Sequence, residues 1–248
     1  MTCSPIGIAE VLNGGLPPVA LSLTRDPDLW FEGYVQTYLE RDVRTAAQIA
    51  DVMPLRRLLV LSALRSSQVL NISGLARDAA LSPTTTARYL DLMETFFLIR
   101  RLSPYLANPT ARLIKAPKIY FTDAGLLGHL GRASPEPLDD DPLRGPILES
   151  FVLNDILAIL GAHRPRAEVH FWHIQGRYEV DFIISDGRSA IGIEVKAADT
   201  FKMRDLDPLT RFLETHPEAK AGILAYNGDD VMKIKDKLFV VPISVLLS

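Results

Sequence analysis

Large apolar residues recur at helical spacing in the first part of the chain, from Leu29 to about Ala50. A stripe of this kind predicts one long helix that buries a single face. Acidic residues near its start and arginines near its end suit the helix dipole. The stripe consists of Trp30, Tyr34, Val35, Tyr38, Leu39 and Val43.

Three shorter helices are predicted next, over residues 54–66, 72–80 and 83–97. Pro54 suits a first helical turn, where its missing N–H is not needed. Ser82-Pro83 combines an N-cap with a proline at the first helical position and marks the clearest helix start in the chain. The buried stripe of the helix that follows is Ala87, Leu90, Met93 and Phe97.

Two strands are predicted after these helices, at residues 98–105 and 113–122, around the turn signal Asn108-Pro109. Three short helices followed by a hairpin predict a winged helix. Residues 1–28 are rich in Gly and Pro, which predicts a tail or loop. The helical and winged-helix domain is therefore expected over residues 29–132.

The stretch 133–142 is acidic and rich in proline, as linkers between domains often are. A second domain is therefore expected over residues 143–248. Its apolar pattern predicts the order αβββαβ with a terminal strand, an α/β arrangement with a mixed sheet. The predicted helices cover residues 146–160 and 203–215, and the predicted strands cover residues 169–174, 178–184, 190–196, 221–226 and 238–242.

Composition places the chain among soluble globular proteins, with 248 residues of which 48% are hydrophobic and 23% charged. Its longest apolar runs, such as residues 58–64 and 151–160, contain polar residues or fall short of the roughly 20 residues that a bilayer requires, so no membrane span is expected. The amino terminus lacks the pattern of a secretory signal. Cys3 is the only cysteine, which rules out an internal disulfide. We therefore expect a cytoplasmic protein.

The net charge of −3 conceals an uneven distribution. Residues 51–120 hold ten Lys and Arg against four Asp and Glu, a balance of +6, so the rest of the chain carries −9. A basic segment between acidic ones is the asymmetry expected if one module faces phosphate, although a solvated basic surface without a ligand is about equally common.

Acidic residues interrupt two strands of the second domain that are otherwise apolar. Glu194 lies within Ile191-Gly-Ile-Glu-Val-Lys196, and Asp181 lies between Val180 and Phe182. Alternation along a strand places Glu194 and Lys196 on the same face, and the helix before the sheet offers Glu149. We expect Asp181, Glu194, Lys196 and Glu149 to converge on one cleft.

Carboxylates on adjacent strands beside a lysine are typical of a metal-dependent site that acts on phosphate. Mg²⁺, or Mn²⁺ in its place, takes oxygen ligands and keeps several waters, so Asp181 and Glu194 would hold it, with Glu149 acting through water or on a second ion. Lys196 would orient a water or stabilise charge on phosphorus. The alternative is structural: Glu194 and Lys196 form an ion pair, and Asp181 caps a hairpin.

Three segments of this domain resemble the PD-(D/E)xK nuclease superfamily: the helix residue Glu149, the segment Gly176–Ile184, and Ile193-Glu-Val-Lys196. The resemblance implies a restriction-endonuclease-like fold and a metal-dependent DNA endonuclease with catalytic Glu149, Asp181, Glu194 and Lys196. Val180 stands where that motif often has proline, which alters a neighbour and no ligand.

More narrowly, these segments are similar to the carboxy-terminal domain of a widespread prokaryotic AAA-type ATPase family. Gly14-Gly-Leu-Pro17, the helix Tyr34–Arg44 and Tyr120–Leu126 resemble that family too. Family members begin with a P-loop ATPase domain, whereas this sequence has no G-x-x-x-x-G-K-[ST]. We therefore expect no nucleotide binding and no ATPase activity from this chain by itself.

The preferred hypothesis is a DNA-associated protein with a Mg²⁺-dependent phosphodiesterase site and weak duplex binding. The start of the helix after Ser82 would enter the major groove, and basic residues of the wing would meet phosphate. The predicted DNA contacts are Thr84, Thr85, Thr86, Arg88, Arg100, Arg101, Arg112 and Lys115. The rival hypothesis is an inactive regulatory or assembly module of the ATPase family that binds a protein partner or its own copies, with the winged helix used only for packing.

Overall fold

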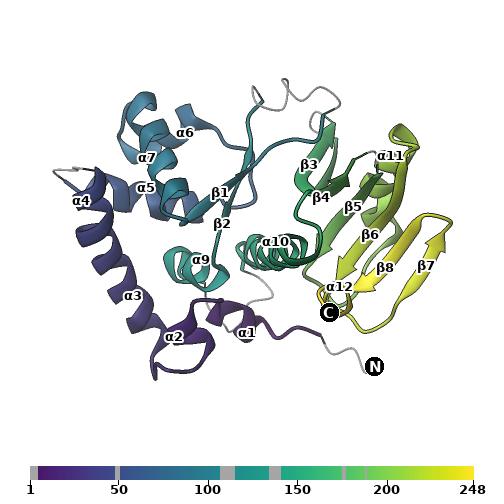
Figure 1. Cartoon of the computed structure of the whole chain (residues 1–248), viewed down its shortest axis with the longest axis horizontal. Coiled ribbons are helices and arrows are strands. Elements are labelled where there is room, and N and C mark those ends of the chain that lie inside the picture. The colour runs from purple at the N-terminus through teal and green to yellow at the C-terminus, as the bar shows by residue number, and fades with distance from the viewer. Residues whose placement is uncertain (1–4, 48–50, 107–114, 134–140, 175–176, 188) are drawn as a thin grey trace. The chain divides into compact units, whose positions relative to one another are not determined.

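The computed structural model describes residues 5–47, 51–106, 115–133, 141–174, 177–187 and 189–248. The chain forms two compact units, each taken by itself below. A helical unit comprises residues 8–101 and 118–150, and a sheet unit comprises residues 1–7, 102–117 and 151–248. The predicted α/β class with a mixed sheet is confirmed (Figure 1).

Short helices make up most of the helical unit, together with a two-stranded sheet of β1 and β2. In chain order its elements are α1 (Ile8–Asn13), α2 (Pro17–Ala20), α3 (Pro27–Thr37), a π-helix (Tyr38–Val43), α4 (Arg44–Ala47), α5 (Met53–Ala63), α6 (Ile72–Ala79), α7 (Pro83–Thr95), β1 (Ile99–Leu102), β2 (Lys118–Phe121) and α9 (Ala124–Gly131). The expectation that residues 1–28 form only tail or loop is wrong, because α1 and α2 lie within them.

The predicted helix start at Ser82-Pro83 is confirmed. Ser82 lies in extended conformation and its Oγ accepts the N–H of Thr85 at 3.0 Å, while Pro83 opens α7. Asn71 caps α6 in the same manner by accepting the N–H of Gly74. Local sequence is sufficient for these boundaries because each cap bonds to a residue three positions further on.

The long helix predicted from Leu29 is interrupted. α3 begins at Pro27 and gives way at Tyr38 to a π-helical turn, followed by the short α4. The rings of Trp30, Tyr34 and Tyr38 stack in sequence along it, with centroids 5.3 and 5.2 Å apart. The hydroxyl of Tyr38 donates to the carbonyl of Phe96, which ties this helix to the end of α7.

Asp123 links the beginning of the helical unit to its end. One oxygen of its carboxylate accepts the N–H of Leu126 at 2.7 Å and so caps α9, and the other accepts the N–H of Gly15 at 2.7 Å. Gly14 lies in the left-handed region with φ 66°, and a Cβ there would meet Asp123 Oδ1 at 2.4 Å. Glycine at position 14 is therefore required by its backbone conformation and by the close approach of this carboxylate.

The sheet unit carries the predicted order αβββαβ. In chain order its elements are α10 (Arg144–His163, shared with the helical unit), β3 (Glu168–Ile174), β4 (Tyr178–Asp186), β5 (Ser189–Lys196), a 3-10 turn (Met203–Leu206), α11 (Asp207–Thr215), β6 (Ala219–Tyr226), β7 (Met232–Lys235), β8 (Leu238–Pro242) and α12 (Ile243–Leu246). β7 was not predicted, because its Met-Lys-Ile-Lys pattern is short and the strand lies at the sheet edge.

Six strands form one mixed sheet in the order β3-β4-β5-β6-β8-β7 (Figure 1). β3, β4 and β5 are antiparallel neighbours, and β6 runs parallel to both β5 and β8. α11 packs on one face of this sheet. A Cβ on Gly192 of β5 would lie 3.0 Å from the ring of Phe212, so glycine there lets α11 approach closely.

Residues 103–105 extend the β3 edge of this sheet. Pro104 forms a parallel bridge with Phe171, and the N–H of Tyr105 donates to the Phe171 carbonyl at 2.6 Å. Ser103 Oγ lies 3.0 Å from His170 Nδ1. The predicted wing strand 98–105 therefore ends as β1 at Leu102, and the residues after it belong to the sheet unit.

Among the described helices, α10 is long and apolar enough, by length and composition, to cross a bilayer. Buried helices of soluble proteins meet the same criterion. Ile147, Val152 and Leu153 of α10 are buried, which accounts for part of its apolar character. The absence of a membrane span stays a prediction.

We expect Asp123→Ala to lower the free energy of unfolding by about 2–4 kcal/mol, because it removes the α9 cap and leaves the Gly15 N–H without its acceptor. Asp26→Ala is the matched control, since Asp26 caps α3 from an exposed position and its loss should cost about 1 kcal/mol. Urea unfolding followed by circular dichroism measures both. Equal effects of the two variants would contradict the linking role of Asp123.

Candidate functional site

Asp181 and Glu194 lie on the neighbouring strands β4 and β5, where the ladder between these strands stops. The last described pair of the ladder joins Phe182 to Ile193, so each acid is the next residue along its own strand. Asp181 Oδ2 accepts the N–H of Val195 at 2.9 Å. The carboxylate of Asp181 is therefore fixed beside the peptide unit that joins Glu194 to Val195.

A β-bulge lies at this position in β4. The pairs His170–Ile183 and Trp172–Val180 leave Phe171 of β3 opposite two residues of β4, Asp181 and Phe182. Bulges redirect a side chain away from regular alternation, and they are frequent next to functional sites. The orientation of Asp181 therefore follows from the bulge and from its bond to the Val195 N–H, and not from the regular strand that was predicted.

The side chains of the two acids and of Lys196 are partly or fully buried. Asp181 is 6% exposed, and Glu194 and Lys196 are half-buried. A buried carboxylate is stable only when hydrogen bonds or opposite charges compensate its lost hydration. The Val195 N–H supplies part of that compensation for Asp181.

Lys196 pairs with an acid that sequence analysis did not select. Its Nζ lies 3.3 Å from Asp205 Oδ2, and the same oxygen accepts the N–H of Lys202 at 2.8 Å. Burial of the Asp205 carboxyl raises its pKa, but the hydrogen bonds from Lys202 and Lys196 outweigh this and hold the pKa below its ordinary value. Asp205 is the third residue of the 3-10 turn Met203–Leu206, where its side chain bonds back to the backbone of Lys202.

Glu149 belongs to the helical unit, on the first half of α10. There the hydroxyl of Tyr120 donates to Glu149 Oε2 at 3.3 Å. The convergence of Glu149 with the acids of the sheet unit stays a prediction. Within the described part of the chain, no three His, Cys, Asp or Glu side chains gather closely enough to hold a metal ion.

The predicted groove-facing residues of α7 differ in their exposure. Thr84 and Arg88 are exposed, and the hydroxyl of Thr85 lies 2.8 Å from that of Ser82. The prediction for Thr86 is wrong, because its side chain is fully buried and donates to the Ser82 carbonyl at 3.0 Å. Thr86 is part of the helix cap and of the core, so it offers nothing to DNA.

The predicted phosphate contacts are also unequal. Arg100 is exposed, whereas the guanidinium of Arg101 binds Glu94 and Asp91, so phosphate would have to compete with these two acids for it. A phosphate contact from Arg101 stays a prediction. Arg112 lies outside the described residues, and Lys115 is exposed in the sheet unit.

Comparisons with known proteins cover both parts of the chain. Residues 9–137 match the family described as "Domain of unknown function (DUF8612)", and residues 144–246 match the one described as "Domain of unknown function (DUF4143)". "Uncharacterized protein Mb2031c" of Mycobacterium bovis and "Uncharacterized protein Rv2008c" of Mycobacterium tuberculosis are each 28% identical over 239 residues. That match covers 96% of this chain and 53% of each relative, so the chain spans about half their length. No solved structure gives a significant match.

The depressed pKa of Asp205 predicts a pH-dependent contribution to stability. The ionised carboxylate stabilises the fold above its ordinary pKa of 3.8, and this contribution is lost as the pH falls through the lower folded-state value. We expect Asp205→Asn to lower the free energy of unfolding at pH 6 by about 1 kcal/mol, and the difference to shrink at pH 3. Urea titrations at both pH values test this, with exposed Asp207→Asn as control; a pH-independent difference would contradict it.

Proposed function

The chain belongs to the family described as "Domain of unknown function (DUF8612)", and we propose that it is a DNA-associated protein whose sheet unit carries a Mg²⁺-dependent phosphodiesterase site. The supporting observation is the Asp181 carboxylate, fixed beside the Glu194–Val195 peptide with Lys196 two residues from Glu194. The resemblance of these segments to PD-(D/E)xK nucleases supports the same hypothesis.

The donor set suits Mg²⁺. This ion is commonly held by one or two carboxylates together with waters and substrate phosphates, so it needs no three-residue protein cage. Asp181 and Glu194 supply hard oxygen donors on adjacent strands. When bound, the ion would polarise the phosphate and lower the pKa of a water.

The protein's own side chains have separable roles in this proposal. Asp181 and Glu194 hold the ion, and the Val195 N–H keeps the Asp181 carboxylate from turning away. The Lys196 ammonium lies two residues beyond Glu194 and would stabilise charge on the phosphate. Asp205 acts through Lys196 as a positioning residue, because it restrains the ammonium at 3.3 Å.

The helical unit would supply DNA affinity. The order α5, α6, α7, β1, β2 supports the winged-helix hypothesis. Thr84 and Arg88 are the exposed candidates on α7, and Arg100 is the exposed candidate on β1. Fewer of the other basic residues in the +6 segment are free to meet DNA than their number suggests. Lys118 is buried, and Arg56 and Arg65 are ion-paired.

A second candidate function has its own supporting observations. Lys196 is engaged by Asp205, and the chain spans about half the length of the curated relatives it matches. Exposed leucines at Leu21, Leu23 and Leu29 lie between α2 and the first turn of α3. These features suit an inactive regulatory or assembly module of an AAA-type ATPase family that binds protein.

Metal binding and cleavage separate the two candidates. We expect Mg²⁺ and Mn²⁺ to raise the melting temperature and support cleavage of duplex DNA, and Ca²⁺ to bind without cleavage. Asp181→Asn should lose both responses, because the amide can still accept the Val195 N–H but no longer binds the ion well. Lys196→Ala should keep the metal response and lose cleavage.

Asp186→Asn, at the exposed end of the same strand, is the matched control and should behave as the wild type. Glu149→Gln tests the sequence prediction for α10, and loss of cleavage supports it. A melting temperature that no divalent ion changes, or a change that survives in Asp181→Asn, would favour the inactive module.

DNA binding should depend on exposed arginines of the helical unit. We expect Arg88→Glu and Arg100→Glu each to weaken duplex binding about three- to tenfold and to make the salt dependence shallower, because fewer counterions are released. Fluorescence anisotropy at several salt concentrations measures both quantities. Exposed Arg166→Glu in the sheet unit is the control. Unchanged affinity in both variants would show that the helical unit does not dock on DNA through this face.

A further inference from the structure

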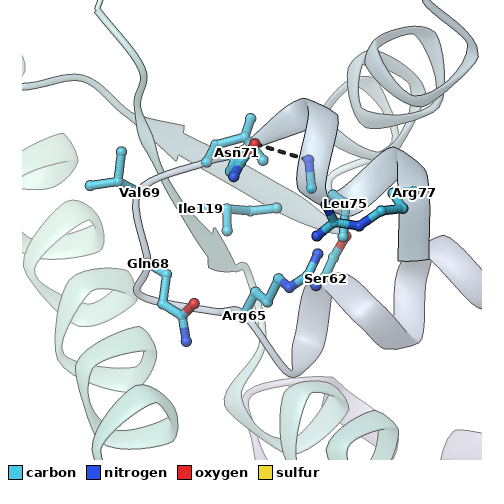
Figure 2. A pocket seen from close by; sticks show the side chains of 10 residues that line it. Ser62, Arg65, Gln68, Val69, Asn71, Leu75, Arg77 and Ile119 are labelled. Carbon is cyan, nitrogen blue, oxygen red and sulfur yellow. Dashed lines mark hydrogen bonds between the residues drawn. The ribbon is translucent and has the colours of Figure 1, made fainter. Parts of the chain in front are cut away.

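A pocket of about 210 Å³ lies between α5, α6 and β2 of the helical unit (Figure 2). Its apolar wall includes Leu75 of α6 and Ile119 of β2. Its polar wall comprises Ser62, Arg65, Gln68, Asn71 and Arg77. None of the ten residues that line it in the described structure is acidic.

Ser62 marks this pocket as more than a gap in packing. Its side chain is fully buried, and its Oγ has no hydrogen-bond partner within the described part of the chain. A buried hydroxyl without a partner is uncommon, and it destabilises the fold unless something fills its place. Ser62 lies in the pocket wall, so a ligand in the pocket can supply the missing partner.

Two arginines converge on the same side of the pocket. Figure 2 shows the side chains of Arg65, in the turn after α5, and of Arg77, on α6, extending toward Ser62. Both contact the carboxylate of Asp78, Arg65 through Nη2 and Arg77 through Nε at 3.4 Å. The hydrogen bond from Arg65 lowers the pKa of Asp78, so this acid is ionised at neutral pH and offsets one of the two positive charges. Donors of Arg77, whose side chain is 80% exposed, remain directed to the pocket and solvent.

We propose that this pocket binds a small phosphate monoester, with Arg77 and Arg65 on the phosphate oxygens and the Ser62 hydroxyl on a polar atom of the ligand. The proposal is independent of the metal-type site in the sheet unit. It goes beyond the proposed DNA docking, because the α7 and β1 residues offered for DNA do not line this pocket.

Size limits the ligand. Pockets for drug-sized molecules usually enclose roughly 300–1,000 Å³, so 210 Å³ suits a smaller one. The volume is nevertheless several times that of one water, about 30 Å³, which leaves room for a short carbon chain beside the phosphate. Leu75 and Ile119 offer the surface on which that chain would pack.

Donor chemistry favours phosphate. Guanidinium groups bind the oxygens of phosphate in pairs, and a monoester presents three such oxygens. The amide of Asn71 adds a donor, because its Oδ1 already accepts the N–H of Gly74 and its Nδ2 is left for other partners. A metal cation is disfavoured by two arginines and by the lack of an acidic lining residue.

Calorimetry on the full chain tests the proposal, with inorganic phosphate, glycerol 3-phosphate and sodium acetate as probes. We expect saturable binding of glycerol 3-phosphate, weaker binding of inorganic phosphate, and weaker binding still of acetate. Arg77→Ala should weaken binding at least about tenfold, because it removes charge-assisted hydrogen bonds. Exposed Arg166→Ala is the control and should bind as the wild type.

Ser62→Ala gives an independent readout. We expect it to weaken binding about two- to tenfold, while the ligand-free protein becomes no less stable, because the variant removes a buried hydroxyl that lacked a partner.

A duplex with a 5′-phosphate, compared with its hydroxyl counterpart, distinguishes the end of a nucleic acid from a free metabolite as the source of the phosphate. If the phosphorylated duplex competes with glycerol 3-phosphate and its hydroxyl counterpart does not, the ligand is the end of a nucleic acid. If neither duplex competes, the ligand is a free metabolite.

The proposal is overturned by any of three results. The first is that neither phosphate probe saturates at millimolar concentration. The second is that acetate binds as tightly as glycerol 3-phosphate. The third is that Arg77→Ala and Ser62→Ala both leave the affinity for phosphate unchanged.

Discussion

The hydrogen bond between the Val195 N–H and the Asp181 carboxylate determines the geometry of the candidate site. It forms where the β4–β5 ladder ends and where β4 bulges against Phe171. The Asp181 side chain thus accepts a backbone N–H close to the last described pair of the ladder, Phe182–Ile193. This bond places the Asp181 carboxylate beside Glu194. The position of Lys196 and its pairing with Asp205 follow from the same strand.

Local and long-range interactions explain what the sequence could predict. The αβββαβ order and the start of α7 follow from periodicity and from a cap that spans three residues. α1 and α2 escaped prediction because the Gly14-Gly15 segment between them depends on Asp123, 108 residues away from Gly15. A periodic pattern also could not reveal the π-helical turn at Tyr38, since apolar spacing reports a face and not the backbone hydrogen bonds that generate it.

The candidate site residues likewise divide into those that local sequence could predict and those that depend on contacts distant in the sequence. Alternation pointed to Asp181, Glu194 and Lys196 as charged residues on neighbouring strands. It could not reveal the bulge in β4 or the pairing of Lys196 with Asp205. Counting charges likewise suggested a basic surface without showing which cations are engaged. Arg101 is engaged by Glu94 and Asp91, and the buried hydroxyl of Thr86 donates to the Ser82 carbonyl at the start of its own helix.

The two proposed sites carry opposite charge, and this difference sets what each requires. The candidate site in the sheet unit includes three carboxylates, of Asp181, Glu194 and Asp205, and one ammonium, that of Lys196, which pairs with Asp205. These residues together are negative when ionised and disfavour a phosphodiester. A divalent cation reverses that balance, which is why phosphate chemistry in the sheet unit would depend on metal. The pocket between α5, α6 and β2 joins two guanidinium groups to one carboxylate, Asp78, and is positive without any ion. Phosphate binding in the helical unit should therefore persist in a metal chelator, whereas any phosphate chemistry at Asp181 should not.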